Sequence, residues 1–163
     1  AGLSARKAEY LGDLDGWWEN HYHGYGELRR TAMDILLEDH RLEQIVRLVG
    51  QESLPAKDRF VLLCAEIIKN GFLQQNSFDE NDMFCSPEKQ VELLRIIGDL
   101  YQNGLRLLAG GVGLGEIADL EAVSGISRLK SLHGNRDVQA IRDFRERILT
   151  DLSTLSMKKG GVK

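Results

Sequence analysis

Apolar residues recur at intervals of three and four along most of this chain, and this spacing restricts the fold more than any other feature. It places the apolar side chains along one face of a helix, and several such helices predict an all-α bundle. No segment has a convincing strand pattern. The runs are Leu28/Ala32/Ile35/Leu36, Leu42/Ile45/Val46/Val49, Phe60/Leu63/Cys64/Ile67/Ile68, Val91/Leu94/Ile97/Tyr101/Leu105/Leu108 and Val138/Ile141/Phe144/Ile148/Leu152/Leu155.

Helix boundaries are marked by a few residues with special backbone preferences. The chain has two prolines, Pro55 and Pro87, and both lie where an apolar run begins. Proline suits a first helical position because the N–H group that it lacks would be unpaired there. Ser86 is a plausible N-cap for the helix after Pro87, and Gly50 is expected to end an earlier one. We expect about six helices joined by short loops, with residues 110–115 (GGVGLG) as a flexible break.

The length of 163 residues favours one domain, which we place at residues 1–155. Residues 156–163 include Lys158, Lys159 and Gly160, and we expect a disordered tail there. We expect Trp17 and Trp18 to anchor the first helix, with one ring buried and the other partly exposed.

Charge and composition exclude several classes of protein. The net charge is −4, and the 28% of charged residues are of both signs, which argues against nucleic-acid binding. No apolar run approaches the roughly 20 residues that a membrane span requires, and no signal-peptide pattern occurs. Cys64 and Cys85 are expected to be reduced, incidental thiols.

The residues alone indicate no active site. No phosphate-loop motif is present, and the glycines around Val112 follow no predicted strand. His21 and His23 lie beside each other without a second ligand cluster, so we expect no metal site. Cys85 has no histidine within its own segment, and we expect no catalytic residue in this chain.

Residues 72–90 are the best candidate for a binding segment. Phe72, Phe78 and Phe84 lie there among amide and acidic side chains, on a stretch without helical spacing. Loops that present aromatic and amide groups from a rigid scaffold commonly bind a ligand.

Four motifs occur in order within this sequence: IVRLVG at 45–50, DRF at 58–60, FLQQNSFD at 72–79 and CSPEKQ at 85–90. Together they resemble the C-terminal helical domain of the catalytic A subunit of V/A-type rotary ATPases. The resemblance extends from about Tyr10 to Leu155.

The resemblance implies a role beside the adenine of a bound nucleotide. It places Phe78 against the base, with Phe84 as a second aromatic and Gln75 as a polar contact. Stacking on an aromatic ring contributes roughly 1–3 kcal/mol per base. The alternative is that Phe78 and Phe84 only pack the loop onto the bundle. ATP or ADP with magnesium is expected in the full subunit, and no cofactor is expected in this chain by itself.

The resemblance also implies a mechanical role for residues 51–58, as the loop that pushes the central rotor shaft. We expect Glu52, Ser53, Leu54, Lys57 and Asp58 to make the rotor contact. Because only two of these are acidic, apolar contact through Leu54 is expected to matter more than ion pairs. An ordinary turn between two helices is the alternative.

The implied whole is an ATP-hydrolysing or ATP-synthesising subunit of a proton- or sodium-translocating machine, peripheral on the cytoplasmic side of a membrane. Its expected partners are an upstream nucleotide-binding domain, B subunits and the rotor shaft. This chain is not expected to hydrolyse ATP alone because phosphoryl transfer needs a phosphate cradle. Two other hypotheses remain: a free-standing helical adaptor for another protein, and a small enzyme that uses Cys85.

Overall fold

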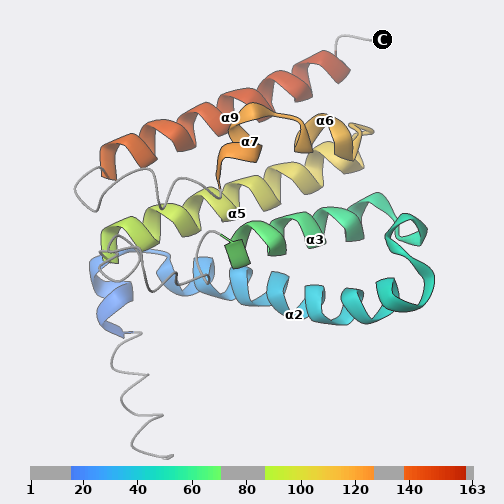
Figure 1. Cartoon of the computed structure of the whole chain (residues 1–163). Coiled ribbons are helices and arrows are strands. Elements are labelled where there is room, and N and C mark those ends of the chain that lie inside the picture. Colours follow the sequence, from blue (N-terminus) through green and yellow to red (C-terminus); the bar gives the residue numbers. More distant parts are fainter. Residues whose placement is uncertain (1–15, 71–86, 127–137, 161–163) are drawn as a thin grey trace, which may run out of the picture.

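A computed structural model describes residues 16–70, 87–126 and 138–160. The described residues form helices and turns and contain no strand, which confirms the predicted all-α class (Figure 1). The elements in chain order are α2 (Tyr25–Val49), the 3-10 turn η1 (Gln51–Ser53), α3 (Ala56–Ile68), α5 (Pro87–Ala109), α6 (Leu114–Ala118), α7 (Glu121–Gly125) and α9 (Val138–Gly160).

The two apolar runs between Leu28 and Val49 belong to one helix of 25 residues, α2, and not to two. Asp39 lies between the two runs, where its side chain is buried and the helix continues through it. Gly50 ends α2, as expected, with a φ of 85° that glycine adopts without steric cost. Its N–H group donates to the carbonyl of Val46 at 2.9 Å.

The four long helices lie side by side (Figure 1). α2 and α3 form an antiparallel hairpin, α5 packs against both, and α9 covers the opposite side of α5. α9 runs in the same direction as α5, so their C-terminal ends lie at one end of the bundle, together with the α2–α3 turn (Figure 1). α6 and α7 lie between α5 and α9 in the sequence and complete the core with Ile117, Ala122 and Val123.

The contact between α3 and α5 is a close fit around one aromatic ring. Phe60 of α3 is fully buried, and its ring lies parallel to that of Tyr101 at 6.3 Å between centroids. The ring also lies directly over Gly104 of α5. A Cβ atom at Gly104 would come within 2.1 Å of Phe60 Cζ, so only glycine fits at this crossing without a shift of the ring.

The glycine-rich stretch after α5 separates α5 from α6, as expected, and its first residues form a hydrogen-bonded helix end. Gly111 has a φ of 93°, and its N–H group donates to the carbonyl of Leu108 at 3.1 Å. Val112 donates to the carbonyl of Leu107 at 2.9 Å, and both of these side chains are buried. This pair of hydrogen bonds is a Schellman motif, which pairs the last carbonyls of the helix and seals its end with an apolar contact.

Two further expectations are corrected at the ends of the chain. Residues 156–160 continue α9 as exposed helix, so the tail predicted at 156–163 is wrong for this part. Neither tryptophan is fully buried: Trp17 is 43% exposed, Trp18 is half-buried, and neither belongs to the core cluster. Trp18 stacks on Tyr25 at 4.7 Å and Trp17 on His21 at 4.2 Å, so the rings form an aromatic cluster at the start of α2 outside the core.

Candidate functional site

The residues predicted for the nucleotide side, Gln75, Phe78 and Phe84, lie outside the described residues. The structure describes the two elements that flank them. One is α3, which continues into a short π-helical segment at residues 69–70, and the other is α5, which begins at Pro87 as the sequence predicts.

The end of α3 is held to α2 by a charged cluster. Lys69 Nζ lies 2.5 Å from Oδ2 of the buried Asp39 and 3.1 Å from Oε1 of Glu43. The hydrogen bond to Asp39, more than any other contact, raises the pKa of Lys69. The Lys69 ammonium in turn lowers the pKa of Glu43. This cluster fixes the point at which the chain leaves α3.

The α2–α3 turn, residues 50–55, separates the predicted rotor residues into two groups. Glu52, Ser53 and Lys57 lie outside the core, as does Asp58 in the first turn of α3. Leu54 is only 8% exposed and belongs to the core cluster. The expectation that Leu54 offers an apolar surface is therefore wrong for this structure, because its side chain anchors the turn to the bundle.

Hydrogen bonds hold this turn in one shape. The Ser53 hydroxyl donates to the carbonyl of Val49 at 2.8 Å, and the N–H group of Leu54 donates to the carbonyl of Gln51 at 3.1 Å. The Gly50 N–H group is paired as well, with the carbonyl of Val46. The turn is thus a short, anchored connection between two helices. We call this turn, together with the flanking residues 47–49 and 56–58, the tip.

Sequence reasoning missed the apolar residues that the tip does expose. Leu48 is 86% exposed and Val49 is 56% exposed, both in the last turn of α2. The spacing rule assigned Val49 to the buried face, but its side chain is more than half exposed. Leu48 lies outside the apolar run, so its exposure agrees with the spacing, although its place in the motif at 45–50 gave it no predicted role.

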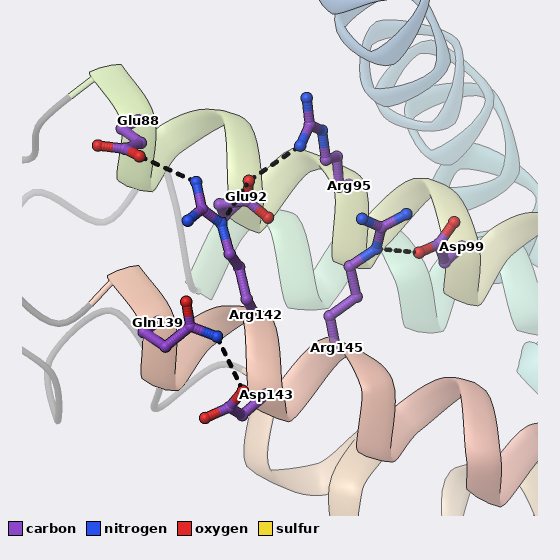
Figure 2. Close-up of polar contacts among 8 residues, drawn as sticks. All are labelled: Glu88, Glu92, Arg95, Asp99, Gln139, Arg142, Asp143 and Arg145. Atoms are coloured by element: carbon purple, nitrogen blue, oxygen red, sulfur yellow. Dashed lines mark hydrogen bonds and ion pairs between the residues drawn. The ribbon is translucent and has the colours of Figure 1, made fainter.

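A ladder of ion pairs joins the N-terminal halves of α5 and α9 (Figure 2). Arg142 of α9 donates to Glu88 at 2.9 Å and to Glu92 at 3.3 Å, and Arg145 donates to Asp99 at 2.5 Å. Arg95 of α5 completes the group with a contact of 2.9 Å to Glu92. We call these contacts the charge ladder.

Glu92 is the centre of the charge ladder. Its side chain is 3% exposed, whereas those of its partners Arg95 and Arg142 are 31% and 45% exposed. Both arginines bind Oε1, and Oε2 is buried with no hydrogen-bond partner among the described residues. A buried carboxylate is stable only when cations compensate its charge, so Glu92 ties α9 to α5.

Other chemistries find no support in the described part of the chain. It contains no group of three or more His, Cys, Asp or Glu side chains arranged to hold a metal ion. Cys64 is buried, and burial raises the pKa of its thiol, so the reactive thiolate is disfavoured. Among the described helices, none is long and apolar enough to cross a membrane.

Comparison with known proteins decides what kind of bundle this is. Residues 15–112, which contain α2, α3 and α5, match the model of the C-terminal domain of V and A type ATP synthase. The chain belongs to this family. The matched region contains both the α2–α3 turn and the segment with Gln75, Phe78 and Phe84, so the resemblance stated from the motifs is confirmed.

Relatives of this ATP synthase domain are A subunits or alpha chains. A V-type ATP synthase alpha chain of Halothermothrix orenii is 39% identical over 142 residues, which cover 86% of this chain and 24% of that protein. The A subunit of an A-type ATP synthase of Methanopyrus kandleri is 38% identical over 140 residues, with coverages of 85% and 24%. Its counterpart in Ignicoccus hospitalis is 39% identical over 150 residues, with coverages of 90% and 25%. The chain thus spans about a quarter of the length of these relatives.

Proposed function

We propose that this domain is the force-transmitting part of a catalytic A subunit, which moves when nucleotide binds and pushes the central rotor shaft through the α2–α3 turn. The anchored tip with exposed Leu48 and Val49 carries the proposal. A tip that transmits force must keep its shape under load, and its hydrogen bonds, with the buried Leu54, provide that stiffness.

The helices give this tip a long arm. α2 has 25 residues, which at 1.5 Å per residue make a rod of about 37 Å. Interdigitated side chains make a packed bundle resist deformation, so a rotation at one end reaches the other as a displacement. The charge ladder and the close fit at Gly104 join α9 and α3 to α5, so that the bundle moves as one body.

The polar groups of the tip define the contact that it makes. Arg47 and Lys57 are cationic and Glu52 and Asp58 are acidic, so the tip has no net charge from these four residues. An ion-paired contact with a strongly charged shaft is therefore disfavoured. The apolar side chains of Leu48 and Val49 provide the larger contact, and shape complementarity provides the rest.

The nucleotide side of the proposal rests on family membership and on Phe78, Phe84 and Gln75. An upstream domain of the full protein would hold the phosphates and magnesium of ATP, and this domain would supply the aromatic side of the adenine pocket. The complete machine would include B subunits and would lie on the membrane surface at the cytoplasmic side. Replacing Phe78 by alanine should weaken the nucleotide affinity of the full protein by about 5- to 150-fold, the equivalent of roughly 1–3 kcal/mol.

Cross-linking in the assembled complex tests the mechanical role. A single cysteine at Glu52, in a background without Cys64 and Cys85, should form a disulfide with cysteines placed along the rotor shaft and stop rotation until it is reduced. A cysteine at Gln139, which is exposed at the opposite end of the bundle, is the control. A free-standing adaptor predicts no cross-link to the shaft from either position, and that result would refute the proposal.

A further inference from the structure

A groove runs between the C-terminal halves of α5 and α9, at the end of the bundle opposite the charge ladder. Its volume is about 420 Å³. The ion pairs of the ladder join α5 and α9 near the start of both helices, and the groove lies beyond them. We call it the α5–α9 groove. Its lining residues are Asn103, Arg106, Leu107, Gly110, Val112, Leu149, Leu152, Ser153, Ser156, Lys159 and Gly160.

The groove has an apolar floor and a polar rim. Leu107, Val112 and Leu152 are buried and form the floor, and Leu149 is half-buried beside them. The Schellman end of α5 fixes one wall, because it holds Val112 against Leu107. A groove with an apolar floor and a polar rim suits an amphipathic helix, which would place apolar side chains spaced by three and four residues along the floor.

The charges of the rim are of one sign. Arg106 and Lys159 are the charged residues in the lining, and no acidic side chain accompanies them among the described residues of the groove. Both side chains are exposed, and neither makes a hydrogen bond or ion pair within the described part of the chain. The arginines of the charge ladder, on the same two helices, all contact carboxylates. In a chain of net charge −4, the described lining of this groove thus has two positive charges and no negative one.

We propose that the α5–α9 groove is a docking site for an acidic amphipathic helix of a partner protein. Its apolar face would cover the floor, and its carboxylates would pair with Arg106 and Lys159 as those of α5 pair with Arg142 and Arg145. Charge complementarity identifies the partner, because a basic or uncharged helix would leave both cations unpaired. The groove residues are none of those assigned to the tip or to the nucleotide side, so the proposal does not depend on the proposed function.

Two simpler roles for the cations have to be distinguished from docking. Helix C-terminal ends favour cations, and both residues lie near such an end. Lys158 shares that position in α9 but does not line the groove, so it provides a matched control. A pair of cations can also bind a small anion, and inorganic phosphate tests for that role.

Titration of the isotope-labelled chain followed by NMR tests the proposal. The probe is a capped helical peptide of about five turns, with leucines at intervals of three and four and glutamates on the flanks of that stripe. We expect shifts of the amide signals of Gly110, Ser153 and Ser156, with none at Arg142. The double variant Arg106→Glu/Lys159→Glu should lower the affinity at least about tenfold. The same variant should gain affinity for a peptide with lysine in place of every glutamate.

The control variant Lys158→Glu should change the affinity less than about twofold, because that side chain is not part of the groove. The proposal is wrong if the glutamate peptide leaves the groove signals unshifted, or if the lysine peptide binds the unmodified chain equally well. It is also wrong if Lys158→Glu weakens binding of the glutamate peptide as much as the single change Lys159→Glu does. Equal shifts with inorganic phosphate alone would show a small-anion site in its place and overturn the proposal.

Discussion

α5 packs against both α3 and α9 through buried apolar side chains, and the two interfaces add different features: a close fit of shape towards α3 and ion pairs towards α9. On the α3 side, Phe60 fills the space over Gly104, and Cys64 is buried in the same core. On the α9 side, the charge ladder joins arginines that are 31% to 45% exposed to carboxylates on α5. The α3 interface cannot accommodate an added atom at Gly104 without a shift of Phe60. The long arginine side chains of the α9 interface, in contrast, can adjust to a small displacement of α9 relative to α5. We infer that the α3 side is the rigid element of the bundle and the α9 side the adaptable one.

The largest expected effect concerns the reactivity of Cys64 at the α3 side. In a Cys85→Ser variant, the native chain should react with a thiol reagent at least about a thousandfold more slowly than the unfolded chain, because labelling requires large-scale opening. Burial also raises the pKa of this thiol and keeps it protonated. Rapid labelling at neutral pH under native conditions would show that the α3 side opens easily. That result would contradict the inference that the α3 side is the rigid element of the bundle.

Gly104→Ala tests whether shape is decisive on this side. The added Cβ would lie 2.1 Å from Phe60 Cζ, so we expect a loss of about 2–3 kcal/mol in the free energy of unfolding, measured by urea denaturation. Gly98→Ala on the same helix is the control, because its Cβ would meet Leu28 at 3.4 Å, close to an ordinary contact. That control should be neutral or slightly stabilising, since alanine favours helix. Equal effects of both changes would show that the fit around Phe60 is not special.

Glu92→Gln tests the α9 side. Loss of the buried charge leaves Arg95 and Arg142 with a weaker acceptor, and we expect a loss of about 1–2 kcal/mol in the free energy of unfolding. Glu88→Gln removes a carboxylate that also contacts Arg142 but is 48% exposed, and its effect should stay below about 0.5 kcal/mol. If Glu88→Gln costs as much as Glu92→Gln, burial is not what makes Glu92 the centre of the ladder.

The smallest expected effect is a change of pKa at the Lys69 cluster, a charged contact outside the α9 side. Lys69 lowers the pKa of Glu43 from the ordinary 4.5, so Glu43 contributes stability at neutral pH that is lost as pH falls through its folded pKa. In Lys69→Met, the Glu43 pKa measured by NMR should rise towards its ordinary value. Glu38, whose pKa is lowered by Arg41, should keep its value as the control.

Local sequence signals predicted the helix class and several helix ends. Gly50 and Pro87 mark boundaries because their own backbone preferences set them, whatever the rest of the chain does. The continuity of α2 was not predictable in this way. Asp39 lies between the two apolar runs, and the charge of its buried side chain is compensated by Lys69, a residue of the following helical segment. A rule that considers only neighbouring residues in the sequence cannot take this partner into account.

The candidate sites show the same limit. The motifs identified the family and the α2–α3 turn, but Leu54, expected as an apolar contact surface, is buried, and Leu48, for which no role was predicted, is exposed. Whether a leucine near a helix end is buried depends on where the neighbouring helix stops, which spacing does not contain. Gln75, Phe78 and Phe84 remain predictions. The α5–α9 groove is formed by residues from two helices that are far apart in the sequence, so no local sequence pattern predicts it.

The parallel course of α5 and α9 has a consequence for how the chain folds. The α9 arginines of the ladder and their carboxylate partners on α5 are 46 to 54 positions apart, whereas α2 and α3 meet across a short turn. Bringing such distant segments together costs more chain entropy and slows their association. We expect the α2–α3 hairpin to assemble on α5 first, with α9 the last helix to arrive and the first to detach. Its amide hydrogens should therefore exchange with solvent earliest among those of the four long helices.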